Sequence, residues 1–236
     1  MIKFTSILKL IILLIWSILI ITLAFVAILL TFNSKSAMWI AHKIWTPFIL
    51  FVLGAKMTVT GLEHIDKSKH YIILANHTSN LDIPMLTAGL PLIFYYVAKK
   101  EMQKIPLLGW VMTAAGIIFI DRENKMKAIR SMKIAGNKVK KGKNIMIFPE
   151  GTFDGSKGLL PFKKGAFHLA MHAQTDILPV AIVNAEDVWP EQSSLKLKPG
   201  KVELRIGKPI STKGLTKDKI DDMSDFTRQI IKKLLL

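Results

Sequence analysis

Apolar residues are distributed differently in the first part of the chain and in the rest. Residues 10–32 carry no charged side chain, and Lys9 and Lys35 flank them. A run of this length is enough to cross the hydrocarbon core of a bilayer as one helix. It is longer than the apolar core of a usual signal peptide and lacks a small-residue cleavage motif, so a membrane helix is the preferred interpretation.

A second apolar stretch, residues 37–54, is interrupted by two basic residues and a proline. It also carries Trp39 and Trp45, and tryptophan is favoured at membrane interfaces. The pattern predicts a helix that lies in the headgroup region or dips partway into the membrane, and a helix buried in the protein core is the alternative. We therefore expect residues 1–54 to form a membrane-embedded helical segment.

Residues 55–236 alternate between apolar runs typical of buried strands and longer segments with helical periodicity. Alternation of this kind predicts a single α/β domain, with a mostly buried sheet flanked by helices. The expected strands are residues 57–60, 71–75, 93–98, 116–120, 144–148, 177–183 and 201–206. The expected helices are residues 82–89, 104–114, 125–141 and 162–174.

Two further helical patterns show which side faces the domain. In the basic helix 125–141 the predicted inward stripe consists of Met126, Ile129, Met132 and Val139. Its lysines are expected to face solvent, with a membrane-facing surface as the alternative. Residues 216–236 form an amphipathic pattern whose apolar side holds Ile220, Met223, Thr227, Ile230 and Leu234, so this helix is expected to pack on the domain.

The charge balance restricts the partners. The formal net charge is +16, residues 1–62 hold five lysines and no acid, and residues 99–143 hold twelve basic residues against three acids. Such a field favours phospholipid headgroups or a phosphorylated carrier. Nucleic acid is the second possibility, but no known recognition motif supports it, so no nucleic-acid partner is expected. The absence of cysteine excludes disulfides, thiolate metal sites and a cysteine nucleophile.

The first candidate for chemistry is the stretch NHTSNLD, which contains His77 and Asp82 and follows an expected strand. On one helix, five residues turn roughly 500°, so the two side chains would point about 140° apart. They can meet only if His77 lies in a turn and Asp82 on the next helix, for which Ser79 and Asn80 are suitable N-caps. A carboxylate bonded to an imidazole fixes its tautomer and makes the other ring nitrogen a base. The alternative is a loop without catalytic function.

Two other stretches present polar groups directly after expected strands. Arg122 follows strand 116–120, and a guanidinium matches phosphate geometry, with an ion pair to a neighbouring acid as the alternative. Glu150 and Gly151 follow strand 144–148, where α/β sheets present ligand sites. The glutamate is expected to hold a hydroxyl or order the loop, and the glycine allows a close approach by a substrate.

NHTSNLD and the stretches 116–122, 148–152 and 177–182 resemble, in order and spacing, the four blocks of the glycerolipid acyltransferases. The likeness is strongest to bacterial 1-acylglycerol-3-phosphate acyltransferases, covers about residues 56–210, and includes the string LLPFKKGAF at 159–167.

The resemblance implies transfer of an acyl group from acyl-CoA or acyl carrier protein to the hydroxyl of 1-acylglycerol 3-phosphate, which forms phosphatidate in phospholipid synthesis. It implies a protein of the bacterial inner membrane, with the catalytic domain on the cytoplasmic face and no cofactor or metal. His77 and Asp82 would be catalytic. The expected substrate-binding residues are Asn76, Arg122, Glu150, Gly151, Thr152, Lys163, Lys164 and Pro179. The alternatives are an acyltransferase for glycerol 3-phosphate or another lysolipid, and a membrane lipid-binding protein without catalysis.

One position departs from the family pattern. Many members have arginine after the Glu-Gly-Thr of the third block, whereas Phe153 stands here. The missing phosphate contact is expected from Lys163 or Lys164, unless the acceptor is not lysophosphatidate. Zincin, Walker A, dinucleotide-binding and nucleophile-elbow motifs are all absent from the sequence.

Overall fold

The protein is built on one seven-stranded sheet, seen here in a computed structural model that describes residues 2–152, 158–190 and 195–236. The strand order is β1-β7-β6-β2-β5-β3-β4, and every neighbouring pair is parallel except the antiparallel β6 and β7. This arrangement confirms the predicted α/β class. The strands are β1 (Ala55–Thr60), β2 (Ile72–Ala75), β3 (Phe94–Lys99), β4 (Ile118–Ile120), β5 (Asn144–Ile147), β6 (Ile177–Val183) and β7 (Gly200–Ile206).

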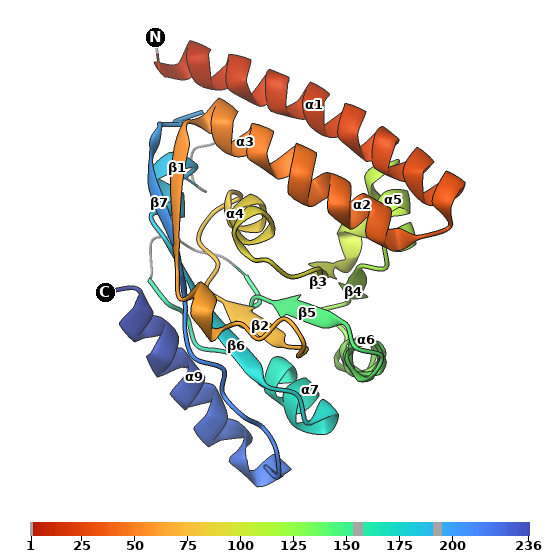
Figure 1. Ribbon diagram of the computed structural model, residues 1–236, viewed down its shortest axis with the longest axis vertical. Helices are drawn as coiled ribbons and strands as arrows, with labels where there is room; N and C mark the ends of the chain where they lie inside the picture. The colour runs from red at the N-terminus through yellow and green to blue at the C-terminus, as the bar shows by residue number, and fades with distance from the viewer. Residues whose placement is uncertain (1, 153–157, 191–194) are drawn as a thin grey trace.

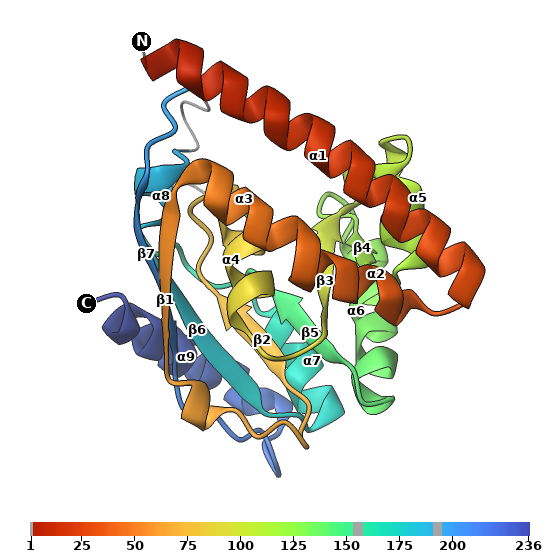
Figure 2. The same cartoon turned by 45° about the horizontal axis from the view of Figure 1, so that its top comes forward.

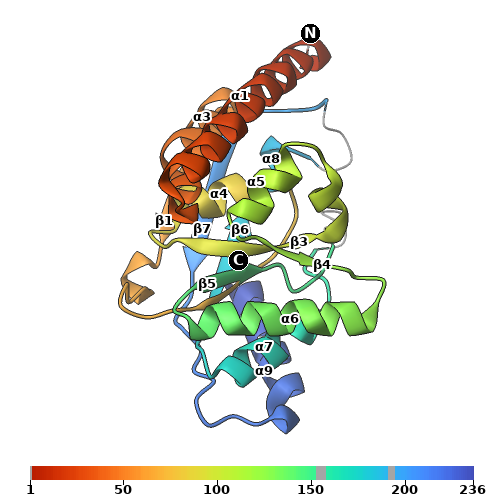
Figure 3. The same ribbon diagram turned by 90° about the vertical axis from the view of Figure 1, so that its right-hand side faces the viewer.

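Helices cover both faces of this sheet (Figures 1 and 3). One face carries α1 (Ile2–Thr31), α2 (Ser34–Ile40), α3 (Thr46–Leu53), α4 (Asp82–Gly89) and α5 (Leu108–Ala114). The other face carries α6 (Lys125–Lys140), α7 (Gly165–Ala173) and α9 (Ile220–Leu234), while the short α8 (Ala185–Val188) follows β6.

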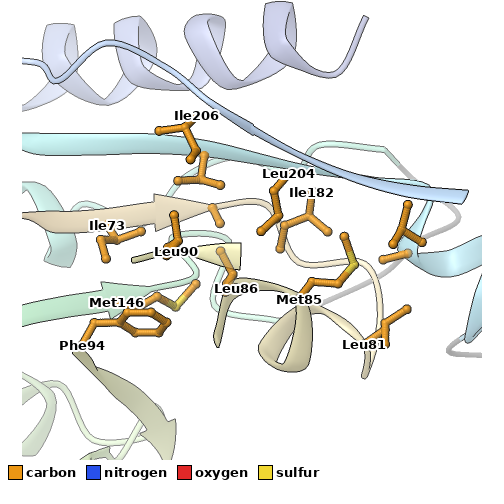
Figure 4. Packing of buried hydrophobic residues seen from close by; sticks show 14 of the residues in the cluster. Ile73, Leu81, Met85, Leu86, Leu90, Phe94, Met146, Ile182, Leu204 and Ile206 are labelled. Atoms are coloured by element: carbon orange, nitrogen blue, oxygen red, sulfur yellow. The ribbon is translucent and has the colours of Figure 1, made fainter. Parts of the chain in front are cut away.

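The central strand β2 shows why the sheet is apolar throughout. Ile73 packs toward α3 and α4, whereas Ile72 and Leu74 pack toward α6, α7 and α9. Because successive side chains of a strand point to opposite faces, a strand buried on both faces must be apolar at every position. Figure 4 shows the first of these layers, in which Ile73 lies among Leu86 and Leu90.

The N-terminal helices form a hairpin that lies along the domain (Figure 2). Ser6, Leu13 and Ile20 recur every seven residues on α1 and are buried, while most of its large apolar side chains are exposed. The Ser6 hydroxyl also accepts the N–H of Leu197 at 3.1 Å, which ties α1 to the loop before β7. Two helical stretches, Phe4–Thr31 and Ser34–Leu53, are long and apolar enough to cross a membrane. Their exposed apolar surface suggests membrane association.

The second apolar stretch has features of both interpretations. It forms a continuous helix, α2 and α3 joined by a π-helical turn at Ala41–Trp45, shortly before Pro47. Ile49 and Leu53 join the domain core, as the core-helix interpretation requires, while Trp39 and Phe51 are exposed.

Several predicted details need correction. Of the expected helix 104–114, only α5 (Leu108–Ala114) is α-helical, and a separate 3-10 helix, Lys100–Lys104, precedes it. Pro106, which has no backbone N–H to donate, lies between the two. The inward stripe of α6 is confirmed only in its second half: Met132 and Val139 pack on the core together with Ala135, whereas Met126 and Ile129 are 75% and 56% exposed. The apolar side of α9 is confirmed.

Candidate active site

The polar residues singled out from the sequence gather at one edge of the sheet. Because β2, β4 and β5 run parallel, their carboxyl ends lie at the same edge. His77 follows β2, Arg122 follows β4 and Glu150 follows β5. Residues widely separated in sequence therefore meet where open α/β sheets bind their ligands.

His77 and Asp82 form a close pair across the turn between β2 and α4. The distance from His77 Nδ1 to Asp82 Oδ2 is 2.7 Å. The same oxygen accepts the backbone N–H groups of Thr78 at 2.7 Å and Ser79 at 2.9 Å. The Asp82 side chain is fully buried and that of His77 is 17% exposed. The turn therefore holds a rigid carboxylate against an imidazole that solvent and substrate can reach.

The start of α4 differs from the predicted cap. Leu81 occupies the N-cap position, and no side chain caps the helix there, so the assignment to Ser79 or Asn80 was wrong. The Ser79 hydroxyl instead accepts the N–H of Leu81 at 3.1 Å and donates to the carbonyl of Trp189 at 2.7 Å. Ser79 therefore ties the turn to the chain after α8.

The protonation state of the pair follows from its surroundings. Burial raises the pKa of Asp82 above its ordinary value, while the His77 imidazole and the two backbone N–H groups oppose the rise. With Nδ1–H donated to Asp82, Nε2 is the basic nitrogen of the neutral ring. The ring also stacks on Phe148, with 3.8 Å between ring centroids and 9° between planes, which fixes its orientation.

Glu150 links the ends of two strands to a neighbouring segment. Its Oε1 accepts the N–H of His77 at 2.8 Å, and its Oε2 accepts the N–H of Leu160 at 2.7 Å. The residue is 4% exposed, and burial raises its pKa, against which both N–H groups act. Of the two roles expected for this glutamate, these contacts match ordering of the loop.

Asn76 is a second structural tie. Its side chain exchanges two hydrogen bonds with the backbone of Ile182 on β6, at 2.9 and 2.7 Å. Pro179 lies within the same strand, pairs with Leu74 and is buried below the site. Thr152 is exposed.

A pocket of about 660 Å³ lies on the α6 and α7 side of the sheet, and neither His77 nor Asp82 is among its lining residues. Phe148 belongs both to its wall and to the stack on His77. The interior is apolar and the rim is basic. Its apolar lining includes Val97, Ile120, Ile129, Met132, Ile147 and Leu169, and its basic residues are Arg122, Lys133, Lys163, Lys217, His168 and His172.

Gly151 allows the pocket wall to approach closely. Its φ is +73°, a left-handed conformation that favours glycine, and an added Cβ would lie 2.8 Å from the Lys163 side chain. Arg122 donates from Nη1 to the Gly151 carbonyl, and burial lowers the pKa of its guanidinium. An ion pair between Arg122 and its neighbour Asp121 is not what holds it, since Asp121 pairs with Lys100 at 3.0 Å.

The two adjacent lysines of the expected phosphate site separate in the structure. Lys163 lines the pocket, whereas Lys164 pairs with Asp221 of α9 at 2.6 Å. Phe153, which stands at the place of the family arginine, lies outside the described residues.

One contributor to the site had no signal in the sequence. Glu186 on α8 accepts a hydrogen bond from the Thr78 hydroxyl at 3.0 Å, so the turn is held from the β6 side as well. A four-residue helix is too short to stand out in a periodic pattern. Across the described ranges, no group of three or more His, Asp or Glu side chains is placed to hold a metal ion.

Comparison with known proteins agrees with this geometry. The chain is similar to the 1-acyl-sn-glycerol-3-phosphate acyltransferase of Saccharomyces cerevisiae, with 38% identity over 86% of this chain and 68% of that protein. It is similar to the alpha enzyme of that name from Mus musculus, with 34% identity over 75% of this chain and 63% of that protein. The crystal structure of the 1-acyl-sn-glycerophosphate acyltransferase of Thermotoga maritima matches with a TM-score of 0.84 and 25% identity, covering 99% of this chain and 95% of that one. Residues 56–183 match the family model named Acyltransferase, and the chain therefore belongs to the acyltransferase family.

Proposed function

We propose that this protein transfers a fatty acyl group from an acyl thioester, acyl-CoA or acyl carrier protein, to the free hydroxyl of 1-acylglycerol 3-phosphate, which gives phosphatidate. The observation that carries the proposal is the His77–Asp82 pair, held at 2.7 Å and connected through the Phe148 ring to a pocket with an apolar interior and a basic rim. The names of the similar yeast, mouse and Thermotoga proteins support the same acceptor.

In the proposed reaction, His77 Nε2 takes the proton from the acceptor hydroxyl as its oxygen attacks the thioester carbonyl. Asp82 holds the ring in the required tautomer and stabilises the imidazolium that forms. The tetrahedral intermediate then collapses, the C–S bond breaks, and the departing sulfur takes the proton from His77. A thiol is a good leaving group, so no covalent enzyme intermediate is required.

The pocket fits amphiphilic substrates. Its apolar interior suits an acyl chain, and Arg122 and Lys163 on its rim offer charge-assisted contacts to a phosphate. Lys164 is engaged with Asp221, so we assign the replacement for the family arginine to Lys163.

The N-terminal hairpin supplies the proposed membrane attachment. Exposed leucines, isoleucines and valines cover α1, and Trp39 and Phe51 extend the apolar surface onto α2 and α3. We propose that residues 1–54 embed in the membrane while residues 55–236 form the catalytic domain. By the resemblance to bacterial enzymes, we assign this membrane to a bacterial inner membrane, with the domain on its cytoplasmic face.

The decisive experiment measures thiol release by the purified full-length protein with a panel of acceptors and both donors. Lysophosphatidate should exceed both alternatives, glycerol 3-phosphate and unphosphorylated lysolipids, by about tenfold or more in kcat/KM. Unphosphorylated lysolipids lack the group that a phosphate site is built to bind, and glycerol 3-phosphate lacks the acyl chain that the apolar pocket would hold. His77→Ala is the control for background hydrolysis. If kcat/KM were higher with glycerol 3-phosphate, that compound would be the acceptor in place of lysophosphatidate. No thiol release with any acceptor would refute acyl transfer.

A further inference from the structure

The C-terminal helix α9 reaches toward the active site through one arginine. Helix α9 packs against β6 and α7, far from His77 in sequence (Figure 1). Its Arg228 donates from Nε to the carbonyl of Leu160 at 3.1 Å and from Nη2 to the carbonyl of Leu159 at 2.6 Å. Two bonds from one planar guanidinium fix both the position and the orientation of the 158–164 segment.

The same segment completes the hydrogen bonding of Glu150. Leu160 presents its carbonyl to Arg228 and its N–H to Glu150, whose other oxygen accepts the N–H of His77. A connected path of three contacts therefore runs from α9 to the backbone of the catalytic histidine. Each contact lies between 2.7 and 3.1 Å.

The charge of Glu150 makes this path sensitive to a shift of the segment. Burial raises the pKa of Glu150, the N–H groups of Leu160 and His77 lower it, and the charged groups facing it are His77 and Asp82. If the 158–164 segment moved, Glu150 would lose one of its two N–H donors and take up a proton at higher pH. A protonated Glu150 accepts less well, and the His77 backbone would lose its anchor.

We propose that Arg228 is a positioning residue for the proposed acyl transfer, acting on His77 through the 158–164 segment and Glu150. The inference depends on the proposed function only for its kinetic readout. The structural part, that Arg228 orders the backbone at His77, stands without it.

The kinetic test compares Arg228→Met with Arg205→Met. Arg205 donates to the carbonyl of Leu234 at 2.9 Å and so holds the other end of α9 without touching the 158–164 segment. Arg228→Met should lower kcat by about ten- to a hundredfold, with KM nearly unchanged, as a misplaced catalytic group does. It should also shift the acid limb of the kcat–pH profile to higher pH, while Arg205→Met keeps the wild-type profile. Arg228→Lys, which keeps the charge but not the fork, should lie in between.

Amide hydrogen exchange of the same variants tests the structural part without relying on activity. Arg228→Met should raise exchange in peptides covering residues 158–164 and 76–79, whereas Arg205→Met should raise it only near the end of α9. Equal kcat losses in the two methionine variants, an unmoved pH limb, or unchanged exchange at residues 76–79 would each overturn the inference. If Arg228→Met does not fold, the same readouts on Arg228→Lys decide. Altered exchange without thiol release in any protein would refute the proposed function and leave the positioning role intact.

Discussion

Asp82→Asn separates the charge of the His77–Asp82 pair, the proposed catalytic pair, from its geometry. The three hydrogen bonds to the Asp82 side chain, from His77, Thr78 and Ser79, all end on Oδ2. The other oxygen, Oδ1, is buried and has no hydrogen-bond partner among the described residues. An asparagine oxygen placed at the Oδ2 position would keep all three bonds. The substitution therefore removes the negative charge and keeps these bonds, but it places an NH₂ group at the buried Oδ1 position.

The expected loss of activity follows from the distance. Unit charges 2.7 Å apart attract with about 6 kcal/mol at an effective dielectric constant of about 20, and this attraction exists only once His77 is protonated during the reaction. A carboxamide keeps part of it through its dipole. We therefore expect kcat to fall by about 10³–10⁴, the size seen when the aspartate of a Ser-His-Asp triad is changed in the same way.

The stability of the variant should change much less than its activity at neutral pH. A carboxyl whose pKa is raised by burial is favoured in its protonated form, so its contribution to stability is present at low pH and lost as the pH rises through the folded-state pKa. At neutral pH the wild type therefore carries the cost of a buried charge that Asp82→Asn lacks. This relief opposes the cost of burying the asparagine NH₂ group, so the variant should unfold at about the same temperature as the wild type at about pH 7. Below about pH 3.9, the ordinary pKa of aspartate, the wild type is protonated too, and the variant should then be the less stable of the two.

Two measurements test these statements: thiol-release kinetics, and thermal unfolding both at neutral pH and below the ordinary pKa of aspartate. His77→Ala gives the rate without a base, and Asp82→Ala shows the effect of losing the hydrogen bonds as well as the charge. A rate for Asp82→Asn above about a tenth of wild type would refute the role of the charge, because removal of a required group costs about 10²-fold or more. A marked loss of stability at neutral pH in Asp82→Asn alone would refute the claim that the three hydrogen bonds are kept.

Three further variants test other parts of the structure. Gly151→Ala should destabilise by about 1 kcal/mol or more, measured by denaturant unfolding, because the left-handed backbone resists a Cβ and Lys163 must move; an unchanged midpoint would contradict this. Ile15→Lys with Leu19→Lys, at exposed positions of α1, should leave the fold intact but weaken vesicle binding in molar salt, whereas unaltered sedimentation would argue against embedding of α1. Glu150→Gln places an amide group against a backbone N–H and should lower kcat by about tenfold or more, with wild-type turnover counting against its role in the loop.

The sequence by itself determined the class of fold and the pairing of His77 with Asp82. Strands such as β2 and β6, buried on both faces, must be apolar at nearly every position, so the chain carries their signal locally. The spacing of His77 and Asp82 likewise required a turn followed by a helix, which the structure shows. The cap assignment failed because the Ser79 hydroxyl bonds Leu81, which precedes the helix, and the distant carbonyl of Trp189.

Only the tertiary structure decided which polar residues share the pocket. Lys163 and Lys164 are equivalent in sequence, but Lys164 is the N-cap residue of α7 and pairs with Asp221 of α9, whereas Lys163 lines the pocket. Met126 and Ile129 fit an inward stripe by periodicity, yet the pocket beside α6 leaves the start of that helix without a core to face. The contribution of Arg228 is invisible in sequence because it depends on the docking of α9, a long-range contact that no local pattern encodes.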